Sequence, residues 1–121
     1  MISRIFLILA VILAALAAIP AAAQPASERA LPFVLAGALR LEFEIEACAI
    51  AATASQRDQL KQALANLQKR TGLPDEAIAK IRREARADMA DPAWKSIQLE
   101  TCKEARVKFK EFLTEVIERS Q

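Results

Sequence analysis

Apolar and charged residues alternate between Leu39 and Glu46, inside the densest apolar stretch outside the N-terminus, which extends to Ile50. Taken alone, this alternation is typical of a strand. Leu, Glu, Arg and Ala are good helix formers, however, and a lone strand would have no partner elsewhere in the chain. We therefore interpret the stretch as part of a helix that begins near Pro32 and continues toward Ala54.

On a helical wheel this segment carries two apolar stripes on opposite sides. The first stripe consists of Val34, Leu41, Ile45, Cys48 and Ala52. The second stripe consists of Leu39, Phe43 and Ile50. Such a helix either lies at the centre of its own bundle or presents one stripe to a partner. The second stripe is therefore a candidate protein-binding surface, for a homodimer or another protein, unless the following helices cover it.

Local signals predict three further helices. Thr53 and Ser55 are N-cap residues that favour a break near Ala54, and Gly72 is typical of a left-handed C-cap that ends the second helix. Pro74 opens the third helix, whose inward positions are Ile78, Ile81, Ala85 and Met89. The pair Asp91 and Pro92 starts the longest helix, which runs to about Arg119. Its apolar residues form a broad stripe for packing on a core: Trp94, Leu99, Cys102, Ala105, Phe109, Phe112, Leu113, Val116 and Ile117.

Four helices with short joints predict an all-α fold, a small antiparallel bundle in which the first and last helices run in opposite directions. We expect this domain to span residues 32–121, after a flexible lead at residues 24–31. If Cys48 faces Cys102, the same register brings Glu42 and Glu44 near Lys108 and Arg106.

The N-terminal segment has the layout of a secretory signal peptide. Arg4 precedes an apolar run from Ile5 to Ile19, and the small residues from Ala21 to Ala23 predict cleavage before Gln24. The run is shorter than the roughly 20 residues of a membrane span, so no transmembrane span is expected after cleavage. The chain is thus predicted to be periplasmic or secreted, with residues 1–23 as its signal peptide.

Two cysteines in an exported protein of this size predict one disulfide, between Cys48 and Cys102. Closing a loop of about 55 residues is expected to stabilise the fold by roughly 4 kcal/mol on the chain-entropy model. Redox catalysis is the alternative, but it is typical of a Cys-x-x-Cys pair, which the sequence lacks.

The net charge of the whole chain is only +2, which gives no argument for binding nucleic acid. The charge is uneven, because Gln56 to Arg86 holds eight basic residues against four acidic ones. The excess is greatest at Lys80, Arg82, Arg83 and Arg86. These residues are a candidate patch for an anionic partner, either an acidic protein or the anionic lipids of the cell envelope; alternatively, they are the solvated face of their helix.

Histidine and tyrosine are absent, which removes the commonest general base and the commonest transition-metal ligand. The sequence therefore predicts no catalytic residues, no metal and no cofactor. It favours an exported interaction protein, such as a chaperone, inhibitor or immunity-type protein. An envelope-surface or anionic-lipid-binding module is the alternative, and an enzyme is the least favoured class.

Overall fold

The computed structural model describes residues 26–121, and within them the regular structure is entirely helical. The elements are α2 (Ala26–Arg29), α3 (Leu31–Ala47), α4 (Ala54–Thr71), α5 (Asp75–Met89) and α6 (Pro92–Ser120). The predicted all-α fold of four main helices is confirmed. The short helix α2 lies in the predicted lead, and α3 begins one residue before the expected boundary, with Leu31 buried. The predicted signal peptide lies outside the described residues.

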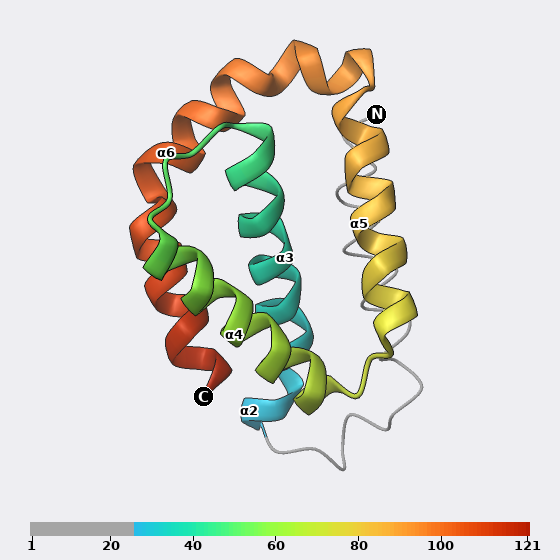
Figure 1. Cartoon of the computed structure of the whole chain (residues 1–121), viewed down its shortest axis with the longest axis vertical. Coiled ribbons are helices and arrows are strands. Elements are labelled where there is room, and N and C mark those ends of the chain that lie inside the picture. Colours follow the sequence, from blue (N-terminus) through green and yellow to red (C-terminus); the bar gives the residue numbers. More distant parts are fainter. Residues whose placement is uncertain (1–25) are drawn as a thin grey trace.

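Helix α3 occupies the middle of the molecule, with α4 and α6 on one side and α5 on the other (Figure 1). The chain direction alternates from α3 through α6, as expected for an antiparallel bundle. Helix α6 first crosses over the end of α3 and then runs down beside it, so that α3 and α6 are antiparallel (Figure 1). Among residues 26–121, no helix is both long enough and apolar enough to cross a membrane.

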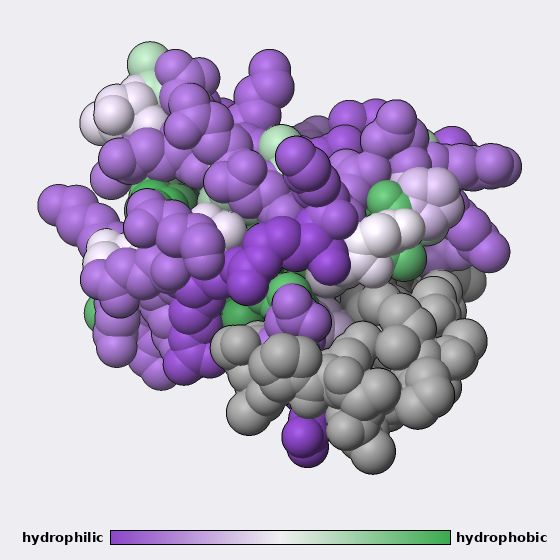
Figure 2. Space-filling view, turned by 90° about the horizontal axis from the view of Figure 1, so that it is seen from below, coloured by the Kyte–Doolittle hydropathy of each residue, from purple (hydrophilic) through white to green (hydrophobic). Residues whose placement is uncertain are grey.

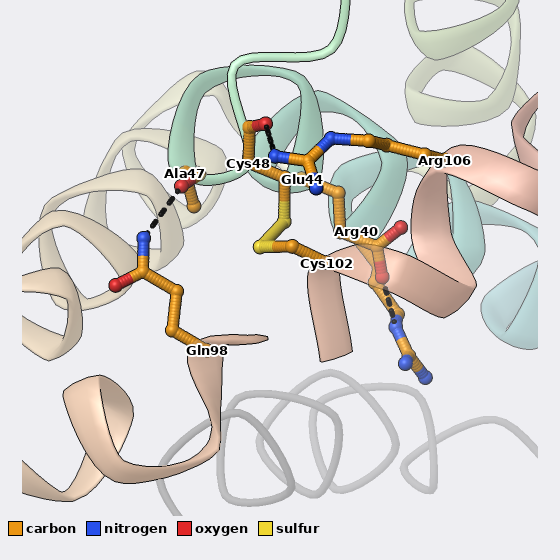
Figure 3. Close-up of a disulfide and its surroundings, with 7 residues drawn as sticks. All are labelled: Arg40, Glu44, Ala47, Cys48, Gln98, Cys102 and Arg106. Carbon is orange, nitrogen blue, oxygen red and sulfur yellow. Dashed lines mark hydrogen bonds and ion pairs between the residues drawn. A yellow bond between two sulfur atoms is a disulfide. The ribbon is translucent and has the colours of Figure 1, made fainter. Parts of the chain in front are cut away.

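The disulfide between Cys48 and Cys102 joins the end of α3 to the middle of α6, as predicted. Two side chains of α6 flank it and reach the same end of α3 (Figure 3). Gln98 donates a hydrogen bond of 3.3 Å to the carbonyl oxygen of Ala47, and Arg106 donates one of 2.8 Å to that of Cys48. These two residues stand four positions before and four after Cys102, so all three lie on one face of α6.

The core is formed mainly by α3, with contributions from all the other main helices. Leu35, Leu67 and Cys48 are the largest side chains that are completely buried. Two residues of the predicted α6 stripe are not buried, because Leu99 is 80% exposed and Phe112 is 39% exposed. Both lie at the edges of the predicted arc, where the neighbouring helices leave much of each side chain open to solvent. The prediction that these two pack into the core is therefore wrong.

The predicted helix boundaries are confirmed where a local signal marks them. Thr53 and Gln56 form a reciprocal capping box at the start of α4. Gly72 adopts a left-handed conformation, with φ of 73°, at the end of α4. The carboxylate of Asp91 accepts a hydrogen bond of 2.9 Å from the backbone N–H of Ala93, and Pro92 begins α6.

Helix α3 ends earlier than expected, at Ala47 rather than near Ala54. Ala49 takes a left-handed conformation, with φ of 49°, and its N–H donates to the carbonyl oxygen of Glu46. The N–H of Ile50 then donates to the carbonyl oxygen of Ile45 at 3.1 Å. This pair of bonds is a Schellman motif, and the buried Ile50 supplies the apolar contact that often accompanies it.

Two of the three residues of the second apolar stripe are buried within the described structure, and the third, Phe43, is partly buried. Leu39 and Ile50 are buried, and Ile50 lies beyond the end of α3 rather than on its helical surface. The ring of Phe43 packs edge-on against that of Trp94, with 5.3 Å between the ring centroids. These three residues belong to the core or its margin, so they do not form an open stripe on the monomer.

Candidate functional site

At the end of the molecule that lies near α2 and the C-terminus, the described hydrophobic surface is divided into small areas (Figure 2). Figure 2 shows the end of the molecule near α2 and the C-terminus, where most of the coloured surface is hydrophilic and the hydrophobic spots are separate. A concave surface that joins apolar and charged groups is therefore the best candidate for a binding site.

Such a surface lies between α3, α4 and α5, as an open groove of about 710 Å³. Helices α4 and α5 meet at the turn around Gly72 and then diverge, while α3 lies between them (Figure 1). The floor of the groove is formed by buried apolar side chains from all three helices: Leu35, Ile45, Leu60, Leu64 and Ile78. We refer to this site as the central groove.

Three pairs of charged residues form the rim of the central groove, one pair on each helix. They are Glu42 and Glu46 on α3, Arg57 and Lys61 on α4, and Arg82 and Arg86 on α5. Each pair is spaced by four residues, which places both side chains on one face of their helix. Four basic groups against two acidic groups leave the rim with excess positive charge, which favours an anionic ligand.

One ion pair joins the rim between helices. Arg82 Nε lies 3.1 Å from Glu42 Oε2, and each side chain is about two-fifths exposed. An ion pair this exposed contributes at most about 1 kcal/mol to stability. It therefore orients Arg82 over the groove more than it stabilises the fold.

The turn between α4 and α5 is held by Gln68, which also lines the central groove. Its side-chain amide donates hydrogen bonds to Asp75 Oδ1 at 2.6 Å and to the carbonyl oxygen of Leu73 at 3.2 Å. These bonds set the relative positions of α4 and α5 at the narrow end of the groove.

The charged residues that were expected to meet between α3 and α6 pair with other partners instead. Glu42 pairs with Arg82, and Glu44 pairs with Arg40 on its own helix at 2.7 Å. Lys108 pairs with Glu104, also on its own helix, and Arg106 donates to the Cys48 carbonyl instead. The pairing of Cys48 with Cys102 was predicted correctly, but the charged side chains of α6 find partners along their own helix or at the end of α3.

The two candidate surfaces predicted from the sequence, the second apolar stripe and the basic patch, each contribute residues in or beside the central groove. Arg82 and Arg86 line the central groove, and with Leu39 and Phe43 they also line a neighbouring hollow of about 60 Å³. Lys80 and Arg83 are exposed on α5 and line neither space, and Ile50 lies away from both. The basic patch is thus divided between a groove-facing half and an outward half.

Arg57 and Lys61 of α4 are rim residues that sequence reasoning did not single out. Both lie in the segment from Gln56 to Arg86 and are two of its eight basic residues. The spacing of four residues between Arg57 and Lys61 indicated that they share one face of their helix. Only the packing of α4 beside α3 shows that they line the same groove as Arg82 and Arg86.

Among residues 26–121, no group of three or more acidic or cysteine side chains is arranged to hold a metal ion. No family model matches the chain, and no curated protein or solved structure is significantly similar to it.

Proposed function

We propose that this chain is an exported helical protein that acts by binding, and that the central groove takes an amphipathic helix with acidic side chains from a partner protein. The observation that carries the proposal is the combination of an apolar floor with four basic side chains on the rim. An amphipathic helix lying in a groove buries its apolar residues on the floor and places its charged residues at the edges. The proposal includes no catalytic step.

Two features support export. The N-terminal segment has the pattern of a secretory signal peptide, and the disulfide between Cys48 and Cys102 is of the kind that persists in oxidising compartments. A fusion of residues 1–23 to a reporter that is active only outside the cytoplasm tests this part. Loss of reporter activity when residues 5–19 carry charged substitutions is the expected control result.

The binding test compares two double charge reversals of equal size. Lys61→Glu with Arg86→Glu alters the rim on both sides of the groove, whereas Lys80→Glu with Arg83→Glu alters the outward half of α5. The probe is a synthetic 18-residue amphipathic helix of Leu and Glu, and its binding to the mature, oxidised protein is measured by calorimetry. We expect the rim variant to lose at least tenfold in affinity and the outward variant to change less than threefold.

The salt dependence of the same binding gives a second readout. Affinity is expected to fall between about 50 and 500 mM NaCl, because exposed charges are screened over a few ångströms at high ionic strength. If the peptide fails to bind the unmodified protein, or if both variants bind it equally well, the central groove is not the binding site.

The exposed Lys80 and Arg83 favour a second candidate function, the binding of an anionic lipid surface. The same two variants distinguish it. Sedimentation with vesicles containing one-third phosphatidylglycerol would then be lost in the outward variant and retained in the rim variant. Equal retention of both variants and of the unmodified protein on these vesicles would remove this candidate.

A further inference from the structure

A second groove, of about 280 Å³, lies between α3 and α6, and none of its lining residues within 26–121 also lines the central groove. Its apolar surface comes from Phe33, Val34 and Leu41 on α3 and from Phe112 and Val116 on α6. Phe33 is 62% exposed, the highest value among the apolar residues of α3, although it stands beside this hollow. The monomer thus leaves an apolar ring in solvent next to an apolar groove.

Gly37 lies in the lining of this groove, in the middle of α3. A glycine inside a helix costs about 1 kcal/mol relative to alanine, so its presence calls for a structural reason. Among residues 26–121 none is evident, because Gly37 does not have a positive φ and a Cβ built there meets no described atom within 4 Å. The open space in front of the Gly37 backbone leaves room for a side chain of another molecule to approach closely.

Phe33 and Gly37 are one helical turn apart, so the ring and the gap lie side by side on the same face of α3. A two-fold axis passing between them, with two copies of α3 antiparallel, would set Phe33 of each copy over Gly37 of the other. Such a face is complementary to itself, as a two-fold dimer interface requires.

The charges around this groove also fit a second copy. The charged lining residues are two arginines and two glutamates, joined as Arg40 with Glu44 and Arg119 with Glu115. Because these positive and negative charges balance, a strongly charged partner gains no electrostatic attraction at this groove. Two copies of the same neutral face can approach each other without net charge repulsion.

We propose that this chain forms a two-fold dimer through the groove between α3 and α6, with Phe33 of each copy seated over Gly37 of the other. The proposal is independent of the function assigned to the central groove, because the two grooves lie on opposite sides of α3. Few residues of each copy line the groove, so the dimer is expected to be weak.

Sedimentation velocity of the mature, oxidised protein between about 1 and 500 μM tests the proposal. The unmodified protein should shift toward the dimer with rising concentration. Phe33→Ala should weaken dimerisation at least tenfold, and Leu99→Ala should leave it unchanged. Leu99 is the matched control, since it is equally apolar and more exposed but lies outside the groove.

Gly37→Ala should change the stability of the monomer and the strength of dimerisation in opposite directions. The added methyl group enters open space in the monomer and raises helix propensity, so the melting temperature of a dilute sample should rise. The same methyl group fills the space reserved for Phe33 of the second copy, so dimerisation should weaken. A protein that stays monomeric to 500 μM, or a dimer that tolerates both Phe33→Ala and Gly37→Ala, would overturn the proposal.

Discussion

Arg106 on α6 donates a hydrogen bond of 2.8 Å to the carbonyl oxygen of Cys48, the C-cap residue of α3. The carbonyl groups at a helix C-terminus lack partners within the helix and carry partial negative charge. The Arg106 guanidinium therefore satisfies one of these carbonyls and complements the dipole of α3. Because Cys48 is also bound to Cys102, one turn away on α6, the bond reinforces the covalent link (Figure 3).

Replacing Arg106 tests this relationship. Arg106→Met keeps much of the apolar stem but removes the donor, and we expect it to lower the free energy of unfolding by about 1 kcal/mol. Urea unfolding followed by Trp94 fluorescence provides the measurement. Lys103→Met, at an exposed position on the same helix, is the control and should change stability by less than about 0.5 kcal/mol. Equal effects of the two substitutions would contradict the assigned role.

Reducing the disulfide should lower stability by roughly 3 to 4 kcal/mol. The bond joins residues 54 positions apart, and both cysteines are buried. Its main effect is to restrict the unfolded chain, which gains loop entropy when the link is removed. Urea unfolding with and without reductant, repeated on Cys48→Ala with Cys102→Ala, measures the loss. A change below about 1 kcal/mol would show that the link contributes little.

Ala49→Gly is expected to stabilise the protein. Ala49 has φ of 49°, a conformation that costs an L-residue about 1 to 2 kcal/mol and costs glycine almost nothing. After subtracting the extra freedom that glycine gives the unfolded chain, a gain of about 0.5 to 1 kcal/mol remains.

Ala51→Gly is the matched control for Ala49→Gly. Ala51 is exposed in the same connection but does not have a positive φ, so glycine there should be neutral or slightly destabilising. Thermal unfolding of the two variants side by side gives the comparison. A loss of stability in Ala49→Gly would contradict the left-handed conformation.

Phe43→Ala should destabilise the fold by about 2 kcal/mol. The substitution removes a partly buried ring and its edge-on contact with Trp94. Because Trp94 is the sole tryptophan, its emission should also shift to longer wavelength as water reaches the indole. Unchanged emission together with unchanged stability would mean that Phe43 does not cover Trp94.

Helix identity and most helix ends were predictable from the sequence because their causes are local. The side chains of Thr53 and Asp91 cap the residues that follow them, and Gly72 needs no neighbour to take a left-handed conformation. The pairing of Cys48 with Cys102 was predictable because two cysteines allow one connectivity. The all-α class followed from helix propensity and from the lack of a second strand.

The tertiary structure decided the features that depend on distant parts of the chain. Helix α3 ends at Ala47 because burial of Ile50, the disulfide, Gln98 and Arg106 together offset the cost of a left-handed alanine, and no local signal marks that end. The central groove exists because α4 and α5 diverge over α3, which brings Arg57 and Lys61 opposite Arg82 and Arg86. Periodicity determines which residues share a helix face, but the neighbouring helices determine whether that face is covered, as the exposed Leu99 and the buried Leu39 show.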